Sequence, residues 1–177
     1  MSHGVRRFTQ LRAWQTCVEY KKAVYAICQT GPLATNFKKR AQLEDSVSGP
    51  PGHIAEGFGR FNPADFARFV VMARSSLMES QNHLLDLVHA NYIDEATLQY
   101  LNALAEAALR EVTGLMEYLQ SPEALRNARR ARERRIASRP ERRNLGAPNP
   151  EPRTENREPR TENPEPEHEP STENREE

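Results

Sequence analysis

The chain has 177 residues, and its 25 basic and 25 acidic side chains give a formal net charge of zero. No apolar run approaches the roughly 18 residues that a membrane-spanning helix needs, and no apolar stretch near the start is typical of a secretory signal. Two cysteines, Cys17 and Cys28, are too few for a disulfide scaffold. We therefore expect a cytoplasmic protein that does not associate with membranes.

The overall neutrality conceals three blocks of different charge. Residues 1–120 hold 12 basic and 12 acidic residues, 121–143 hold nine arginines and three glutamates, and 144–177 hold four arginines and ten glutamates. A basic arm is thus followed by an acidic tail. We predict a flexible N-terminus over 1–7, a helical bundle over 8–120, a basic helical extension over 121–139 and a disordered low-complexity tail over 140–177.

The first predicted helix runs from about Thr9 to Gln29, and Gly31-Pro32 ends it. The second begins near Asn36 or Phe37. Two prolines between two glycines, over 49–52, predict a break or sharp kink in this helix, because proline lacks the N–H that the helix ladder needs. The helix is expected to resume over 54–56.

A glycine turn and a strong helix start come next. Gly57 and Gly59 suit a helix C-terminus, because glycine adopts positive φ without steric cost. Asn62 is a good N-cap, Pro63 suits the first helical position, and Asp65 favours the positive end of the helix. A helix hairpin is predicted here.

The last two bundle helices are expected from Pro63 to about Ala90, and from after Asp94 to near Gln120. Apolar residues in the latter alternate at spacings of three and four, which predicts a seam against a partner helix; they are Leu98, Leu101, Ala105, Ala108, Val112, Leu115 and Leu119. Leu104 and Met116 lie outside this seam and are candidates for contact with a second subunit. The fold class is all-α, an antiparallel four-helix bundle with a basic C-terminal helical extension and a disordered tail.

The basic extension carries the strongest signal outside the core. Ser121-Pro122-Glu123 predicts a fifth helix that continues to about Arg135 and has little apolar surface to bury. Guanidinium groups match phosphate geometry, so this helix supplies the candidate nucleic-acid contacts: Arg126, Arg129, Arg130, Arg132, Arg134 and Arg135. The alternative is a solvated helix, or one neutralised by the acidic tail.

Metal chemistry is weakly indicated. Asp86-x-x-His89, with Glu79 and His83 nearby, could belong to a di-iron bundle. Such a site needs two carboxylate-x-x-His motifs, and this sequence has a single one. We predict no metal and no cofactor.

Phosphate or acid–base chemistry at the glycine turn is the other alternative. Gly57-x-Gly59 with Arg60 and Arg68 could cradle a phosphate, and Glu56 could act as a base with His53. No strand precedes these glycines and no nucleotide fingerprint is complete, so we interpret them as structural. Glu56 is then expected to pair with Arg60 or Arg74. No catalytic residues are predicted, and we do not expect an enzyme.

Several motifs, in order, resemble the bacterial four-helix-bundle proteins of the 23S rRNA-intervening sequence family. The resemblance covers roughly residues 8 to 120, with Leu11-x-x-Trp14-Gln15 in the first helix. Its signature residues are taken as structural: Ile54, Ala55, Glu56, Gly57, Gly59, Arg60, Phe66, Arg74 and Glu79.

The chain departs from the family pattern at three places. Glu44 and Asp45 stand where the family tends to have a basic pair, His53 replaces an asparagine, and two prolines occupy 49–52 where one is usual. The resemblance implies a helical bundle that assembles, commonly as a ring of five, and leaves the biochemical role undefined.

Taken together, the sequence indicates a non-catalytic homo-oligomer, by resemblance a homopentamer. We expect it to bind RNA or another nucleic acid through a basic surface. One alternative is a protein-interaction adaptor or scaffold without a nucleic-acid role. A metal-binding bundle enzyme is the other, and the ligand count disfavours it.

Overall fold

A computed structural model describes residues 5–60 and 62–138. These residues contain helices and no strand: η1 (Phe8–Gln10), α1 (Arg12–Cys28), α2 (Gly31–Thr35), α3 (Phe37–Gly59), α4 (Pro63–His89), α5 (Glu95–Gln120) and α6 (Pro122–Ala137). The predicted tail, Arg139 and residues 1–4 lie outside the described part of the chain.

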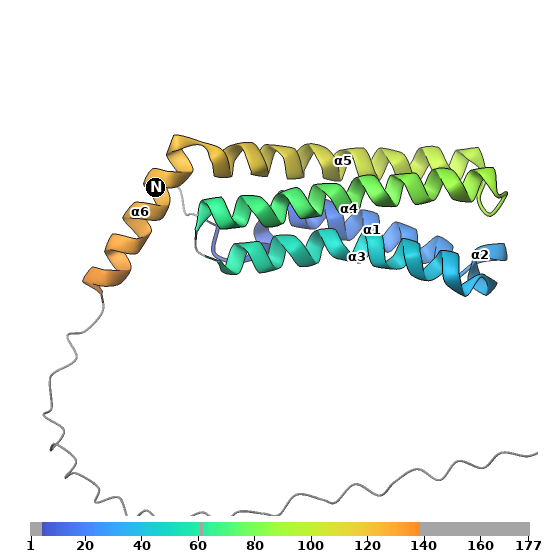
Figure 1. The fold of residues 1–177 in the computed structure, drawn as a ribbon, viewed down its shortest axis with the longest axis horizontal. Helices are drawn as coiled ribbons and strands as arrows, with labels where there is room; N and C mark the ends of the chain where they lie inside the picture. Colours follow the sequence, from blue (N-terminus) through green and yellow to red (C-terminus); the bar gives the residue numbers. More distant parts are fainter. Residues whose placement is uncertain (1–4, 61, 139–177) are drawn as a thin grey trace, which may run out of the picture. The chain divides into compact units, whose positions relative to one another are not determined.

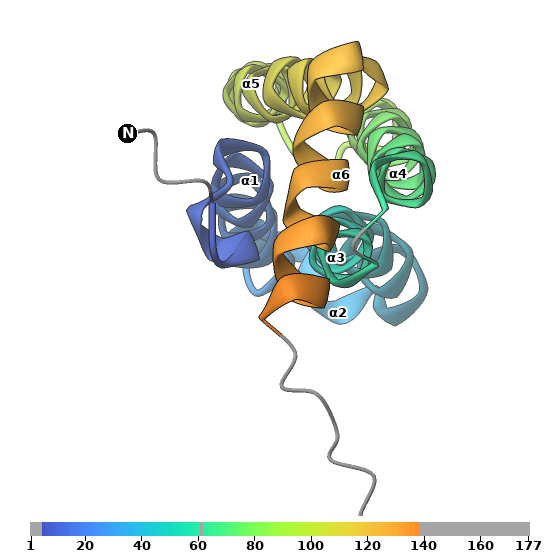
Figure 2. The same ribbon diagram turned by 90° about the vertical axis from the view of Figure 1, so that its left-hand side faces the viewer.

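The four long helices α1, α3, α4 and α5 form an antiparallel bundle (Figures 1 and 2). α3 lies between α1 and α4, and α5 contacts the other sides of α1 and α4. The predicted all-α four-helix bundle is therefore confirmed. Its core contains Tyr20, Leu43, Ile54, Leu77, Leu84 and Leu101, all fully buried.

The predicted helix starts carry the expected caps. The Asn62 side chain accepts a hydrogen bond from the Ala64 amide at 3.0 Å, with Pro63 as the first residue of α4. Asp94 accepts from the Thr97 amide at 2.8 Å at the start of α5. Each cap satisfies an amide that has no partner within the first turn of its helix.

The predicted break in the second helix is wrong, because α3 continues through Pro50 and Pro51. Both prolines are buried, so apolar contacts offset part of the roughly 3 kcal/mol that an interior proline costs. Gly49 precedes them and has no Cβ to clash with the Pro50 ring, which removes one obstacle to helical geometry.

The predicted glycine turn is also wrong in detail, because Gly57 and Gly59 are the last residues of α3 and not a positive-φ loop. Gly57 is required for a different reason. A Cβ added there would lie 2.8 Å from the Phe69 Cβ, so the backbone of α3 closely approaches α4. Among the described glycines, positive φ occurs at Gly31, with φ +58°.

Gly31 opens a helix that the sequence did not predict. Gly31-Pro32 ends α1 as expected, but proline also suits the start of a helix, and α2 begins there. Leu33 buries its side chain in the core, which holds this five-residue helix against the bundle.

Candidate nucleic-acid interface

The predicted basic helix is present as α6. The Ser121 side chain accepts a hydrogen bond from the Ala124 amide at 3.2 Å, Pro122 is the first residue, and Glu123 lies in the first turn. This is the same start chemistry as at α4 and α5, and α6 continues to Ala137, slightly beyond the predicted end.

Only the beginning of α6 is fixed to the bundle. Ala124 is buried, and the Asn127 side-chain amide donates to the Tyr118 hydroxyl of α5 at 3.3 Å. The two large apolar residues of α6, Leu125 and Ile136, are both exposed. Among the described side chains of 128–137, Ala128 is half-buried and the others are exposed.

The arginines of α6 include a regular row. Arg126, Arg130 and Arg134 are exposed and four residues apart, so they follow one side of the helix with a rise of about 6 Å between neighbours. None of the three forms an ion pair with another described residue. A row of unpaired guanidinium groups can bind successive phosphates of one strand.

The remaining arginines of the candidate set lie beside this row. Arg132 is exposed, and Arg135 is also a residue of α6. Arg129 Nε lies 3.1 Å from Glu133 Oε1, with 83% and 61% of the two side chains exposed. Such an exposed pair contributes little stability, so Arg129 remains available to an incoming phosphate.

The family-signature residues lie where α3 meets α4. Ile54 and Phe66 are buried, Ala55 is half-buried, and the Phe66 ring packs edge-on against Phe58 with centroids 6.2 Å apart. Gly57 fits against α4 because it has no side chain. These residues account for the tight hairpin.

The charged residues of the signature lie on the surface of this hairpin. Of the two arginines considered as partners of Glu56, Arg60 is the one it contacts, at 2.5 Å, and its guanidinium lies 5.0 Å from the Phe69 ring centroid. Arg74 is half-buried, and Glu79 lies 3.8 Å from His83. Gly59 is exposed.

The α3–α4 hairpin lacks the geometry that phosphate binding by its glycines, or acid–base chemistry by Glu56 with His53, would require. Gly57 and Gly59 belong to α3, so they do not form a loop that could cradle a phosphate before α4. Within the described residues, no hydrogen bond joins His53 to Glu56. Arg68 is exposed on α4.

The structure also bears on metal binding and on the reactivity of the two cysteine thiols. Across residues 5–60 and 62–138, no group of three or more His, Cys, Asp or Glu side chains could hold a metal ion. Asp86 and His89 are both exposed. Burial raises the pKa of Cys17 to about 12 and that of Cys28 to about 11, so both thiols stay protonated and unreactive at neutral pH.

Sequence reasoning missed an exposed apolar stripe on α4. Val71, Met78 and Leu85 are seven residues apart, and together with Met72 they are each 44–48% exposed. The seven-residue spacing was the signal that could have identified the stripe. Leu104 and Met116, the sequence's candidates for contact with a second subunit, are partly buried and pack against this chain's own core with part of their surface.

No helix in the described part of the chain is both long and apolar enough to cross a membrane. This agrees with the sequence, in which charged residues interrupt every apolar run.

Comparison with known proteins places the bundle in a family. The family model described as 23S rRNA-intervening sequence protein matches residues 9–114, while no curated protein matches the chain. A crystal structure with a similar fold is that of a protein of unknown function from the S23 ribosomal protein family of Bacteroides thetaiotaomicron, at 1.70 Å resolution. That protein is 16% identical, with a TM-score of 0.53 over 62% of this chain and 99% of its own. Because the family model spans more than half of the residues of this chain, the chain belongs to the 23S rRNA-intervening sequence protein family.

Proposed function

We propose that this protein is a non-catalytic oligomer that binds RNA or another nucleic acid through the arginines of α6, in the cytoplasm. The observation that carries the proposal is the row of Arg126, Arg130 and Arg134, exposed and without acidic partners among the described residues. The family description supports RNA over DNA as the ligand, since it refers to ribosomal RNA and names no reaction.

The electrostatics of α6 make binding testable through salt. Each single-strand phosphate that a basic side chain neutralises contributes about −0.7 to the slope of log K against log salt. Replacing Arg126, Arg130 and Arg134 with glutamine preserves helix propensity and removes three charges. We expect the slope for a single-stranded RNA to become less steep by about 2 units.

A matched control removes the same charge elsewhere. Arg12, Lys22 and Arg110 are exposed on α1 and α5, and their triple replacement with glutamine should leave the slope near that of the wild type. If the two triple variants weaken binding equally, the contact is not located on α6. If the full chain binds no RNA at about 50 mM salt, where ionic contacts are strong, the nucleic-acid function fails.

The acidic residues over 144–177 should compete with RNA for the arginines of the basic arm. Residues 144–177 carry ten glutamates and four arginines, and tethering places them at high effective concentration near α6. Truncation after Arg143 is therefore expected to leave RNA affinity unchanged or to raise it. Truncation after Gln120 should remove the RNA contacts of α6, and the part of the salt slope that they contribute, while the bundle remains folded.

Self-association is supported by the stripe of Val71, Met72, Met78 and Leu85. An exposed stripe at seven-residue spacing is the pattern by which a helix packs against another helix, and no helix among the described residues covers this stripe. The same surface is the observation that favours the second candidate function, a protein-interaction adaptor without a nucleic-acid role.

Light scattering tests the assembly. The wild type should have a mass that is a multiple of the 20.2 kDa chain at micromolar concentration. Met78→Glu should shift it towards the monomer without unfolding, because the side chain is about half exposed, whereas Ala103→Glu on the exposed side of α5 should not. A monomeric wild type would contradict the oligomer.

A further inference from the structure

The start of α3 presents an aromatic ring to solvent among basic residues. Phe37 is 72% exposed, the largest value among the described large apolar side chains, and Lys38, Lys39 and Arg40 follow it. This corner lies at the end of the bundle occupied by α2, whereas α6 follows α5 at the opposite end (Figure 1). The two basic surfaces are therefore separate.

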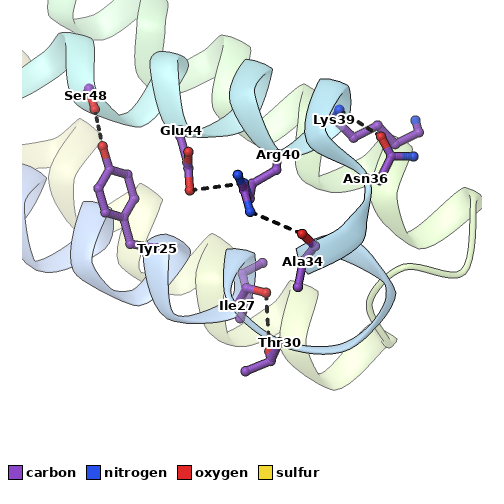
Figure 3. A network of polar contacts seen from close by, with 9 residues as sticks. All are labelled: Tyr25, Ile27, Thr30, Ala34, Asn36, Lys39, Arg40, Glu44 and Ser48. Carbon is purple, nitrogen blue, oxygen red and sulfur yellow. Dashed lines mark hydrogen bonds and ion pairs between the residues drawn. The ribbon is translucent and has the colours of Figure 1, made fainter.

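Arg40 restrains the exposed ring. Its Cζ lies 5.5 Å from the Phe37 centroid, in a cation–π contact. The guanidinium is itself held in place, because Nη1 donates to the Ala34 carbonyl at 3.1 Å and Nε lies 3.9 Å from Glu44 (Figure 3). Phe37 is thus supported by its own helix while most of its surface stays open.

A second aromatic ring lies at the same corner. The Asn36 side chain caps α3 by accepting from the Lys39 amide at 3.1 Å (Figure 3), and it donates to the Tyr92 hydroxyl at 2.6 Å. Lys39 Nζ lies 5.7 Å from the Tyr92 ring centroid. Tyr92 also lines an open cavity of about 440 Å³, which offers space beside this second ring.

The charges at this corner are available to a ligand. Lys38 is exposed and Lys39 half-buried, and neither forms an ion pair with another described residue. Lysine ammonium groups beside an open aromatic ring are the combination by which proteins bind single-stranded nucleic acids: the ring stacks on a base, and the lysines neutralise the phosphates on either side.

We infer that Phe37, Lys38 and Lys39 form a contact site for single-stranded RNA, in which one base stacks on Phe37. The inference rests on the proposed nucleic-acid function and narrows its ligand class to single strands. A base in a duplex is stacked on both faces and cannot reach the ring. The positive charge of the two lysines favours a polyanion over an apolar segment of a second copy of this chain.

The test measures binding of a 12-nucleotide oligouridylate to the full chain, alone or paired with oligoadenylate. Phe37→Ala should weaken binding of the single strand roughly 5- to 100-fold without changing the salt slope, because it removes stacking and no charge. Phe37→Trp should restore the affinity. Lys38→Gln with Lys39→Gln should instead make the slope less steep by about 1.4.

Tyr100→Ala is the matched control. Tyr100 is another strongly exposed aromatic residue, on α5, with no basic residue within four positions in the sequence. Its removal should leave affinity unchanged. A photocrosslink from 5-iodouridine in the same oligonucleotide should map to the peptide that contains Phe37 and not to that containing Tyr100.

Three results would overturn the inference: affinity of Phe37→Ala within twofold of the wild type, equal weakening by Tyr100→Ala, or equal weakening of single strand and duplex. Phe37→Ala that lowers the assembled mass and leaves RNA affinity intact would assign this corner to contact between copies. The Arg126, Arg130 and Arg134 variant separates the two sites. If the triple α6 variant binds RNA like the wild type while Phe37→Ala binds more weakly, the α6 proposal fails and the Phe37 site stands. If the triple variant binds more weakly while Phe37→Ala binds like the wild type, only the Phe37 site is contradicted.

Discussion

α5 and α6 are consecutive helices with the same kind of start and opposite surroundings. Asp94 and Ser121 each cap the third residue of their helix, and Glu95 and Glu123 lie in the two first turns. Yet α5 buries six of the seven residues of its predicted apolar seam, with Leu115 half-buried, and α6 buries Ala124 among its described side chains. Caps and propensity thus determine that a helix forms, and the apolar stripe determines what it packs against.

The largest expected difference between the two helices is in the cost of removing a leucine. Leu101 is fully buried in α5, so Leu101→Ala should lower the free energy of unfolding by about 2–5 kcal/mol. Leu125 of α6 is 55% exposed, and Leu125→Ala should change it by less than about 0.5 kcal/mol. Urea denaturation measures both, and equal losses would mean that α6 packs as α5 does.

Substitution of two glycines tests the difference between a helix surface packed against a neighbour and one that faces open space. Gly57→Ala should cost roughly 1–3 kcal/mol, because the added methyl would overlap the side chains of Phe66 and Phe69. Gly114 lies inside α5, and apart from the adjoining residues and backbone of that helix no atom lies within 4 Å of an added Cβ, so Gly114→Ala should stabilise by about 0.5–1 kcal/mol. Changes of the same sign in both variants would show that the α3–α4 contact is looser than described.

The smallest expected effect is on the pH dependence of the two caps. Hydrogen bonds from Thr97 lower the pKa of Asp94 below its ordinary value of 3.8 in the folded protein. The stabilisation from this cap is therefore complete above about pH 4 and is lost as the pH falls through the folded-state pKa. Asp94→Asn should make the melting temperature fall less steeply in that acidic range, whereas Ser121→Asn, which removes no titratable group, should not alter the pH dependence.

The sequence predicted the helices whose ends are marked by local chemistry. Asn62 with Pro63 and Asp94 with Glu95 each place an N-cap directly before an apolar stripe, and both helices begin there. The start of α6 was predicted from the same signal at Ser121. This helix was also predicted to have little apolar surface to bury, because so few large apolar residues accompany its arginines.

Tertiary contacts decided what local signals could not. The propensity of Pro50 and Pro51 opposes a helix, but their burial against the core is invisible in the sequence. Gly57 was interpreted through backbone freedom, whereas its role is to leave space for Phe66 and Phe69 of the next helix. Phe37 was assigned as a helix start, and its exposure depends on how α2 and α3 pack.

The two buried thiols give the bundle built-in reporters of opening. Cys17 and Cys28 are separated along α1 by about 16 Å at a rise of 1.5 Å per residue. A thiol reagent can modify each one only when the helix around it opens, so the two labelling rates report transient exposure at two levels of the bundle. Mass spectrometry of the labelled peptides would show whether the end with α2 and Phe37 opens independently of the end from which α6 departs.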